Sequence, residues 1–118
     1  MHRPYRNMSV PELEIQYNAR ATVSDFDAEM RIYRAQSDEA YADLSVIQDI
    51  PYGPSADERI DIFPTKNANS PLLVFIHGGY WRALGREDSA FMAKTFVSNE
   101  VAVAILEYTL APSATLDQ

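Results

Sequence analysis

The chain has 118 residues, a length that holds one domain at most. Hydrophobic residues make up 47% of it and charged residues 23%, which is typical of a globular protein and excludes a disordered chain. A net charge of −7 argues against nucleic acid and anionic membranes as partners, and the absence of cysteine excludes disulfides and thiolate metal sites and favours a cytoplasmic location. No apolar run approaches the ~20 residues that span a membrane.

The first third of the chain has two helical patterns. Capping-box spacing from Ser9 to Glu12 predicts the start of one helix, and a second start is predicted at Ser24. The large apolar side chains at helical spacing in the two patterns are Val10, Leu13, Tyr17, Phe26, Met30 and Tyr33. Such stripes indicate core packing, so residues 1–42 are expected to form a helical segment that packs against the rest.

Two segments then alternate between apolar and polar residues. Residues 44–50 and 59–63 follow the period of two that is typical of half-buried strands. In the second segment Ile60 and Ile62 fall on the apolar face and Asp61 on the polar one. A turn-rich stretch joins the segments, so we expect an antiparallel pair.

The last third indicates a parallel pair of strands. Residues 72–76 and 101–106 are apolar throughout, as in strands buried on both faces, and residues 88–98 between them have a helical pattern. Strand, helix and strand in this order predict a βαβ unit with a right-handed crossover. The fold class is therefore α/β, with residues 43–118 as its sheet-forming part.

One loop of this unit has residues suited to chemistry. His77–Trp81 leaves the carboxyl end of an apolar strand, which is where open α/β sheets bind ligands. Gly78 and Gly79 let the backbone approach a ligand closely, so that consecutive N–H groups face a negatively charged oxygen. Such donors form an oxyanion hole, which stabilises the transition state of acyl transfer. A plain tight turn would also account for two glycines.

The sequence around this loop resembles the kynurenine formamidase (arylformamidase) and esterase branch of the α/β-hydrolase fold. The central motif is LLVFIHGGYW at residues 72–81. Further matching segments are Tyr17-Asn-Ala-Arg20, Tyr52-Gly-Pro, residues 59–64 and Tyr108-Thr-Leu-Ala-Pro112. The resemblance covers nearly the whole chain. It implies the N-terminal half of a hydrolase sheet, with an antiparallel strand pair, then a parallel βαβ unit, after two helices.

The resemblance also implies roles for the loop residues. The backbone N–H groups of Gly79 and Tyr80 correspond to the oxyanion hole, and Gly78 permits the bend. His77 is expected to brace the loop through a hydrogen bond to nearby backbone or to pack there, in preference to acting as a base. Trp81, together with Tyr80, lines the substrate pocket in this interpretation, and core packing is an equal alternative for Trp81.

A serine hydrolase of this fold needs a G-x-S-x-G elbow followed by an acid and a histidine. The four glycines are Gly53, Gly78, Gly79 and Gly85, and no two have this spacing. The only histidines are His2 and His77, so the nucleophile, the acid and the base are all absent from these residues. We therefore expect half of a hydrolase domain, inactive by itself, with an open sheet edge through which it self-associates.

The expected function is hydrolysis of an amide or ester through an acyl-enzyme, with N-formylkynurenine as the substrate in the family's most specific form. Alternatives are a general carboxylesterase and a truncated, non-catalytic half-domain. The expected partner is a small aryl formamide or ester. No cofactor and no metal are implied.

Overall fold

The computed structural model describes residues 2–118 and has the predicted α/β class. The elements are α1 (Val10–Tyr17), η1 (Ala19–Thr22), α2 (Phe26–Asp43), β1 (Ile47–Pro51), β2 (Arg59–Phe63), β3 (Leu72–Ile76), η2 (Arg86–Asp88), α3 (Ala93–Ser98) and β4 (Ala102–Leu106). Contacts divide the chain into two compact units, of which the first ends at Met30 and the second begins at Arg31. The predicted domain division at residue 42 stays a prediction. No helix among residues 2–118 is long and apolar enough to cross a membrane.

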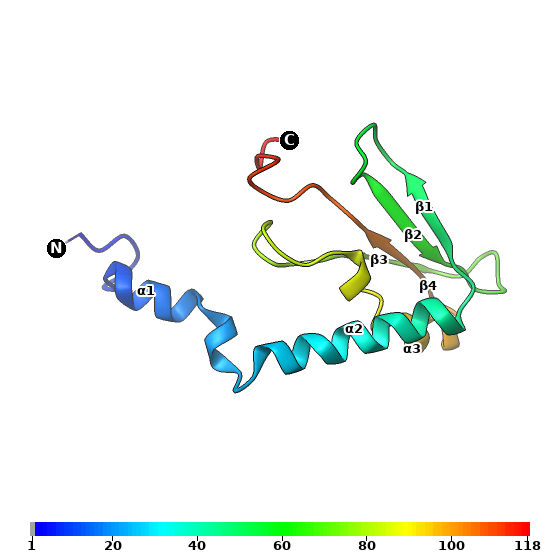
Figure 1. Ribbon diagram of the computed structural model, residues 1–118, viewed down its shortest axis with the longest axis horizontal. Helices are drawn as coiled ribbons and strands as arrows, with labels where there is room; N and C mark the ends of the chain where they lie inside the picture. Colours follow the sequence, from blue (N-terminus) through cyan, green and yellow to red (C-terminus); the bar gives the residue numbers. More distant parts are fainter. Residues whose placement is uncertain (1) are drawn as a thin grey trace. The chain divides into compact units, whose positions relative to one another are not determined.

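The four strands form one sheet in the order β1-β2-β4-β3 (Figure 1). β2 is antiparallel to β1 and to β4, whereas β3 and β4 are parallel, with Val74 opposite Ala104. The antiparallel pair and the strand–helix–strand order are therefore confirmed. β3 is an edge strand of the sheet, and the chain continues from its carboxyl end to His77.

The helical segment differs from the prediction in what it buries. The capping box is confirmed, because the Glu12 carboxylate accepts from the backbone N–H and the hydroxyl of Ser9, at 2.6 and 2.7 Å. The part of the predicted stripe that lies in α1 forms no core within its own unit, since α1 has no buried residue. In α2 the buried residues are Ser37 and Ala40. These small side chains let the helix approach closely, and the Ser37 hydroxyl accepts from the Ala90 backbone at 3.0 Å.

Two predicted elements have different bounds. The helix expected over 88–98 is replaced by η2 and the shorter α3, because the Ala90 N–H donates to the Ser37 hydroxyl of α2 and not to a carbonyl of the preceding turn. The first strand begins later than expected and contains a register shift between Ile47 and Ile50. Asp49 lies in this bulge with a φ of 60°, and its N–H donates to Asp61 instead of the strand ladder.

The two faces of the sheet have different surroundings. Residues paired across neighbouring strands project to the same face. Phe63, Val103 and Ile105 lie on the face against which Ala40 of α2 and Ala93 of α3 pack, and all five are fully buried. We call this the covered face. The opposite face, here the bare face, exposes its β3 residues Leu72, Val74 and Ile76 at 55%, 50% and 61%.

The polarity of β2 is the reverse of the prediction. Asp61, expected on the polar outer side, is 2% exposed on the covered face, and Ile60 and Ile62 lie on the bare face, paired with Leu106 and Ala104. The carboxylate tolerates burial because it accepts hydrogen bonds from Tyr41 at 2.5 Å and from Arg86 at 2.8 Å.

Candidate functional site

The loop after β3 has an unusual backbone. Gly79, Tyr80 and Trp81 have consecutive positive φ angles of 109°, 54° and 57°. L-residues rarely adopt this conformation, and two non-glycine residues in succession indicate strain that the surrounding structure must hold. The turn is closed by a hydrogen bond of 3.0 Å from the Arg82 N–H to the Gly79 carbonyl. Strained backbone of this kind is concentrated at functional sites.

The two glycines of the loop differ in whether the structure has room for a side chain at their positions. A Cβ on Gly79 would collide with the Ala83 carbonyl, and the φ of Gly79 is positive. A Cβ on Gly78 would meet open space. The bend that the sequence assigned to Gly78 therefore depends on Gly79, one residue later, because only Gly79 has both a left-handed φ and no room for a side chain.

The loop lines a cleft of about 1180 Å³ at the carboxyl ends of β3 and β4. The lining includes His77, Gly78 and Gly79 of the loop, the aromatic residues Tyr52, Tyr80, Trp81 and Tyr108, and the acidic residues Asp57 and Glu58. No arginine or lysine is among the described residues that line it. Tyr80 and Trp81 are 66% and 55% exposed, so Trp81 lies in the cleft lining and not in the core.

His77 is the first residue of the loop and is 4% exposed. Its Nδ1 is 2.8 Å from the Gly78 carbonyl and its Nε2 is 2.9 Å from a Glu107 carboxylate oxygen. The Tyr108 hydroxyl donates to the His77 carbonyl at 2.6 Å, and the two rings stack with centroids 4.3 Å apart. These contacts include the predicted type of backbone contact and connect His77 to the segment that follows β4.

Glu107 is the residue of this site that sequence reasoning missed. Besides His77, its carboxylate accepts from the backbone N–H groups of Arg86 at 3.1 Å and Tyr108 at 3.2 Å. The available signal was an acidic residue directly after an apolar strand, which puts it at the carboxyl ends of the strands, as the loop is. The segment is also joined to the loop by a hydrogen bond of 2.7 Å from the Ala111 N–H to the Trp81 carbonyl.

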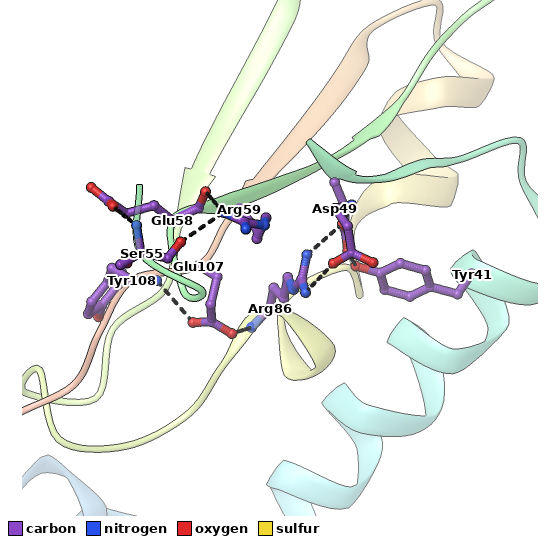
Figure 2. A network of polar contacts seen from close by, with 9 residues as sticks. Tyr41, Asp49, Ser55, Glu58, Arg59, Arg86, Glu107 and Tyr108 are labelled. Carbon is purple, nitrogen blue, oxygen red and sulfur yellow. Dashed lines mark hydrogen bonds and ion pairs between the residues drawn. The ribbon is translucent and has the colours of Figure 1, made fainter. Parts of the chain in front are cut away.

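Arg86 connects the loop to the covered face. Figure 2 shows its backbone next to Glu107 and its guanidinium next to Asp49. The guanidinium bonds to Asp49 at 2.6 Å and to Asp61 at 2.8 Å, and Tyr41 of α2 donates to the same Asp61. Charge-assisted bonds of this kind are shorter and stronger than neutral ones, so they restrain the end of the loop.

Two tyrosines at the cleft remain hydrogen-bond donors at neutral pH. Burial first, and then the charge of Glu107, raise the pKa of Tyr108. Burial, followed by the charges of Glu58, Glu107 and Asp57, raises the pKa of Tyr52. The Tyr52 phenol donates to the Glu107 carbonyl at 2.5 Å, so both tyrosines hold backbone carbonyls at this edge of the sheet.

Comparison with known proteins gives two kinds of similarity. No family model matches the chain. The kynurenine formamidase of Danio rerio is 28% identical over 121 residues, which cover 96% of this chain and 41% of that protein. The kynurenine formamidase of Salmo salar has the same identity and coverage. The chain therefore spans about two fifths, 41%, of the length of these curated relatives.

Solved structures agree on the fold. A candidate thioesterase from a Silicibacter species superimposes with a TM-score of 0.80 and 25% identity, covering 90% of this chain and 41% of that one. Esterase B from Lactobacillus rhamnosis matches with a TM-score of 0.56 and 23% identity over 76% of this chain and 32% of its own, a likeness in fold. The chain thus resembles, over nearly all of its own length, a part of the kynurenine formamidases and esterase-like α/β hydrolases.

Proposed function

We propose that the chain supplies the oxyanion hole of a serine hydrolase that cleaves an amide or ester bond, with aryl formamides such as N-formylkynurenine as substrates. The observation that carries the proposal is the strained loop at Gly79–Trp81, which lines a cleft at the carboxyl ends of β3 and β4. The similarity to kynurenine formamidases over 96% of the chain supports the substrate class.

In this proposal the backbone N–H groups of Gly79 and Tyr80 stabilise negative charge on the substrate carbonyl oxygen. A serine oxygen adds to the carbonyl carbon, the amine leaves with a proton, and water then releases formate from the acyl-enzyme. The serine, its acid and its base would come from outside residues 1–118, because this sequence has no G-x-S-x-G and no suitable histidine.

The cleft lining supports an aromatic and uncharged or cationic substrate. Tyr52, Tyr80 and Trp81 offer ring faces, and Asp57 and Glu58 disfavour an anionic group nearby. The runner-up is a general carboxylesterase, which the fold shared with the Lactobacillus esterase supports. The cytoplasmic location expected from the cysteine-free composition is part of the same proposal.

The decisive experiment compares two proteins. The 118-residue chain and the product of its reading frame continued past Gln118 are assayed for formate release from N-formylkynurenine and for hydrolysis of 4-nitrophenyl acetate. We expect no turnover by the short chain and preferential cleavage of the formamide by a longer product with a G-x-S-x-G elbow. If the longer product cleaves 4-nitrophenyl acetate but releases no formate from N-formylkynurenine, the carboxylesterase is favoured. A stop codon after Gln118 would favour the non-catalytic half-domain.

We also propose that the 118-residue chain self-associates. The unpaired edge of β3 and the exposed Leu72, Val74 and Ile76 beside it support this, because such an edge pairs readily with another strand. Its test is given with the last prediction of the Discussion.

A further inference from the structure

Both ring nitrogens of the buried His77 face an oxygen atom. Nδ1 is 2.8 Å from the carbonyl of Gly78, which can only accept, and Nε2 is 2.9 Å from Oε1 of Glu107. A neutral imidazole has one N–H and therefore satisfies one acceptor only. With His77 4% exposed, water does not relieve the second contact. Both contacts are hydrogen bonds at the same time only if the His77–Glu107 pair holds one proton more than a neutral imidazole and a carboxylate do.

The surroundings favour the imidazole as the site of such an additional proton. Glu107 accepts from the N–H groups of Arg86 and Tyr108, so its other contacts are those of an ionised carboxylate. The imidazole stacks on the Tyr108 ring at 4.3 Å and 12°, and the face of an aromatic ring attracts a cation. An imidazolium between a carboxylate and an aromatic face is well stabilised.

The same carboxylate is bound at both ends of the loop. Oε1 accepts from His77, where the loop begins, and Oε2 accepts from the Arg86 N–H, where it ends. We propose that Glu107 is the positioning residue of the loop 77–86 and that it holds His77 as an imidazolium. The role of the loop as an oxyanion hole rests on the proposed function, whereas the protonation of His77 does not.

This arrangement gives the loop a defined charge. A lone carboxylate bound to both ends of the loop would add a negative charge that disfavours an oxyanion on the loop. Paired with an imidazolium, Glu107 contributes no net charge and still fixes both ends of the strained segment. A substrate oxygen bound to the N–H donors of the loop is then not opposed by a net negative charge from Glu107.

The protonation is tested by nitrogen-15 NMR of the 118-residue chain labelled at histidine, at pH 7. We expect protons on both Nδ1 and Nε2 of His77. The exposed His2 gives the other histidine signal, which the variant H2Q removes. In E107Q a side-chain amide can donate to Nε2, so His77 is expected to lose the Nε2 proton and keep the Nδ1 proton. One unprotonated nitrogen in the unaltered chain, or no change in E107Q, would overturn the proposal.

The positioning role is tested by amide hydrogen exchange at Gly79 and Tyr80. E107A is expected to accelerate this exchange about tenfold, because both ends of the loop lose a charge-assisted hydrogen bond. E107Q keeps hydrogen-bonding groups and is expected to restore most of the protection. The control is E87Q, which removes a carboxylate from an exposed position next to Arg86. Exchange in E107A equal to that in E87Q would contradict the role.

These readouts are independent of hydrolysis. Failure of every substrate assay, with His77 doubly protonated and the loop dependent on Glu107, would refute the proposed function and leave the present inference standing. If E107A does not fold, the His77 signals of E107Q decide the question, since that variant retains polar contacts at the same site.

Discussion

The two faces of the sheet are equally apolar along β3 and β4, and yet they have different roles. On the covered face Val103 and Ile105 are fully buried beneath the helices, and the buried Asp61 joins a charge network. On the bare face Leu72 and Val74 are at least half exposed. Apolar strand residues stabilise this chain where something packs on them, so their contribution follows from the position of the helices and not from their hydrophobicity.

The largest expected effect on the free energy of unfolding comes from comparing a buried residue of the covered face with an exposed residue of the bare face. Replacing Phe63, which is fully buried, with alanine removes a ring from the core and is expected to lower the free energy of unfolding by about 4 kcal/mol. The matched bare-face variant V74A removes side-chain carbons from a residue that is 50% exposed and is expected to cost less than about 1 kcal/mol. Urea denaturation followed by circular dichroism measures both.

A loss of this size can unfold so small a domain, so F63L serves as a milder variant of the same position. Equal losses for the Phe63 and Val74 variants would break the comparison. They would mean that the bare face is covered in solution.

The next effect concerns the charge on the covered face. D61A leaves the Arg86 guanidinium without its buried partner and is expected to cost about 3 kcal/mol. D49A removes the other carboxylate bound to Arg86, but that side chain is 67% exposed, and a loss below about 1 kcal/mol is expected. Thermal or urea unfolding of the two variants gives the difference. Equal losses of unfolding free energy in D61A and D49A would show that burial of Asp61 does not strengthen its ion pair with Arg86.

A smaller effect depends on pH. Burial first, and then the hydrogen bond to Asp61, raise the pKa of Tyr41 above its ordinary value. The folded state thus favours the protonated phenol, and its contribution is fully present below pH ~10, the ordinary pKa of tyrosine, and is lost as the pH rises further. Y41F is expected to cost about 1.5 kcal/mol at pH 7 through the lost hydrogen bond.

The difference between the unaltered chain and Y41F should narrow above pH ~10. Urea unfolding at pH 7, 9 and 10.5 measures it, with Y5F, which changes an exposed tyrosine, as the control. A difference that stays constant over this range would contradict the role of the Tyr41 phenol.

The smallest expected change in stability accompanies a change in association. V74K places a charge on the edge strand β3 and is expected to cost less than about 1 kcal/mol while reducing self-association. Sedimentation velocity at several concentrations measures the association. The control I15K adds the same charge at a residue of α1 that is 73% exposed and belongs to no strand. Equal reduction by both variants would indicate general charge repulsion instead of edge pairing.

Much of the fold could be predicted from local sequence patterns. The capping box at Ser9, the antiparallel pair and the parallel βαβ order all depend on short-range signals and were found in their predicted places. Burial was harder to predict, because it depends on which elements pack together. Asp61 was assigned to the polar side since its partners, above all Arg86, are 25 residues away in the sequence.

The candidate site was predictable in its position but not in its supports. The loop from His77 could be located because paired glycines directly after an apolar strand indicate close backbone approach at the ligand-binding edge of a sheet. Glu107 was missed because its contacts to His77 and Arg86 span 30 and 21 residues and are created by the register of β3 against β4. The left-handed backbone of Gly79 could not be predicted, because neighbouring glycines are equivalent until the backbone angles are known.

The difference between Gly78 and Gly79 has a consequence for variation at this loop. Alanine at position 79 would strain the backbone and collide with Ala83, so selection for a folded protein is sufficient to keep that glycine. Alanine at position 78 would meet no atom of the chain and would project from the lining of the cleft. In a library of loop variants selected for folding alone, position 78 should therefore accept residues other than glycine. Selection for ligand binding should restore glycine at that position.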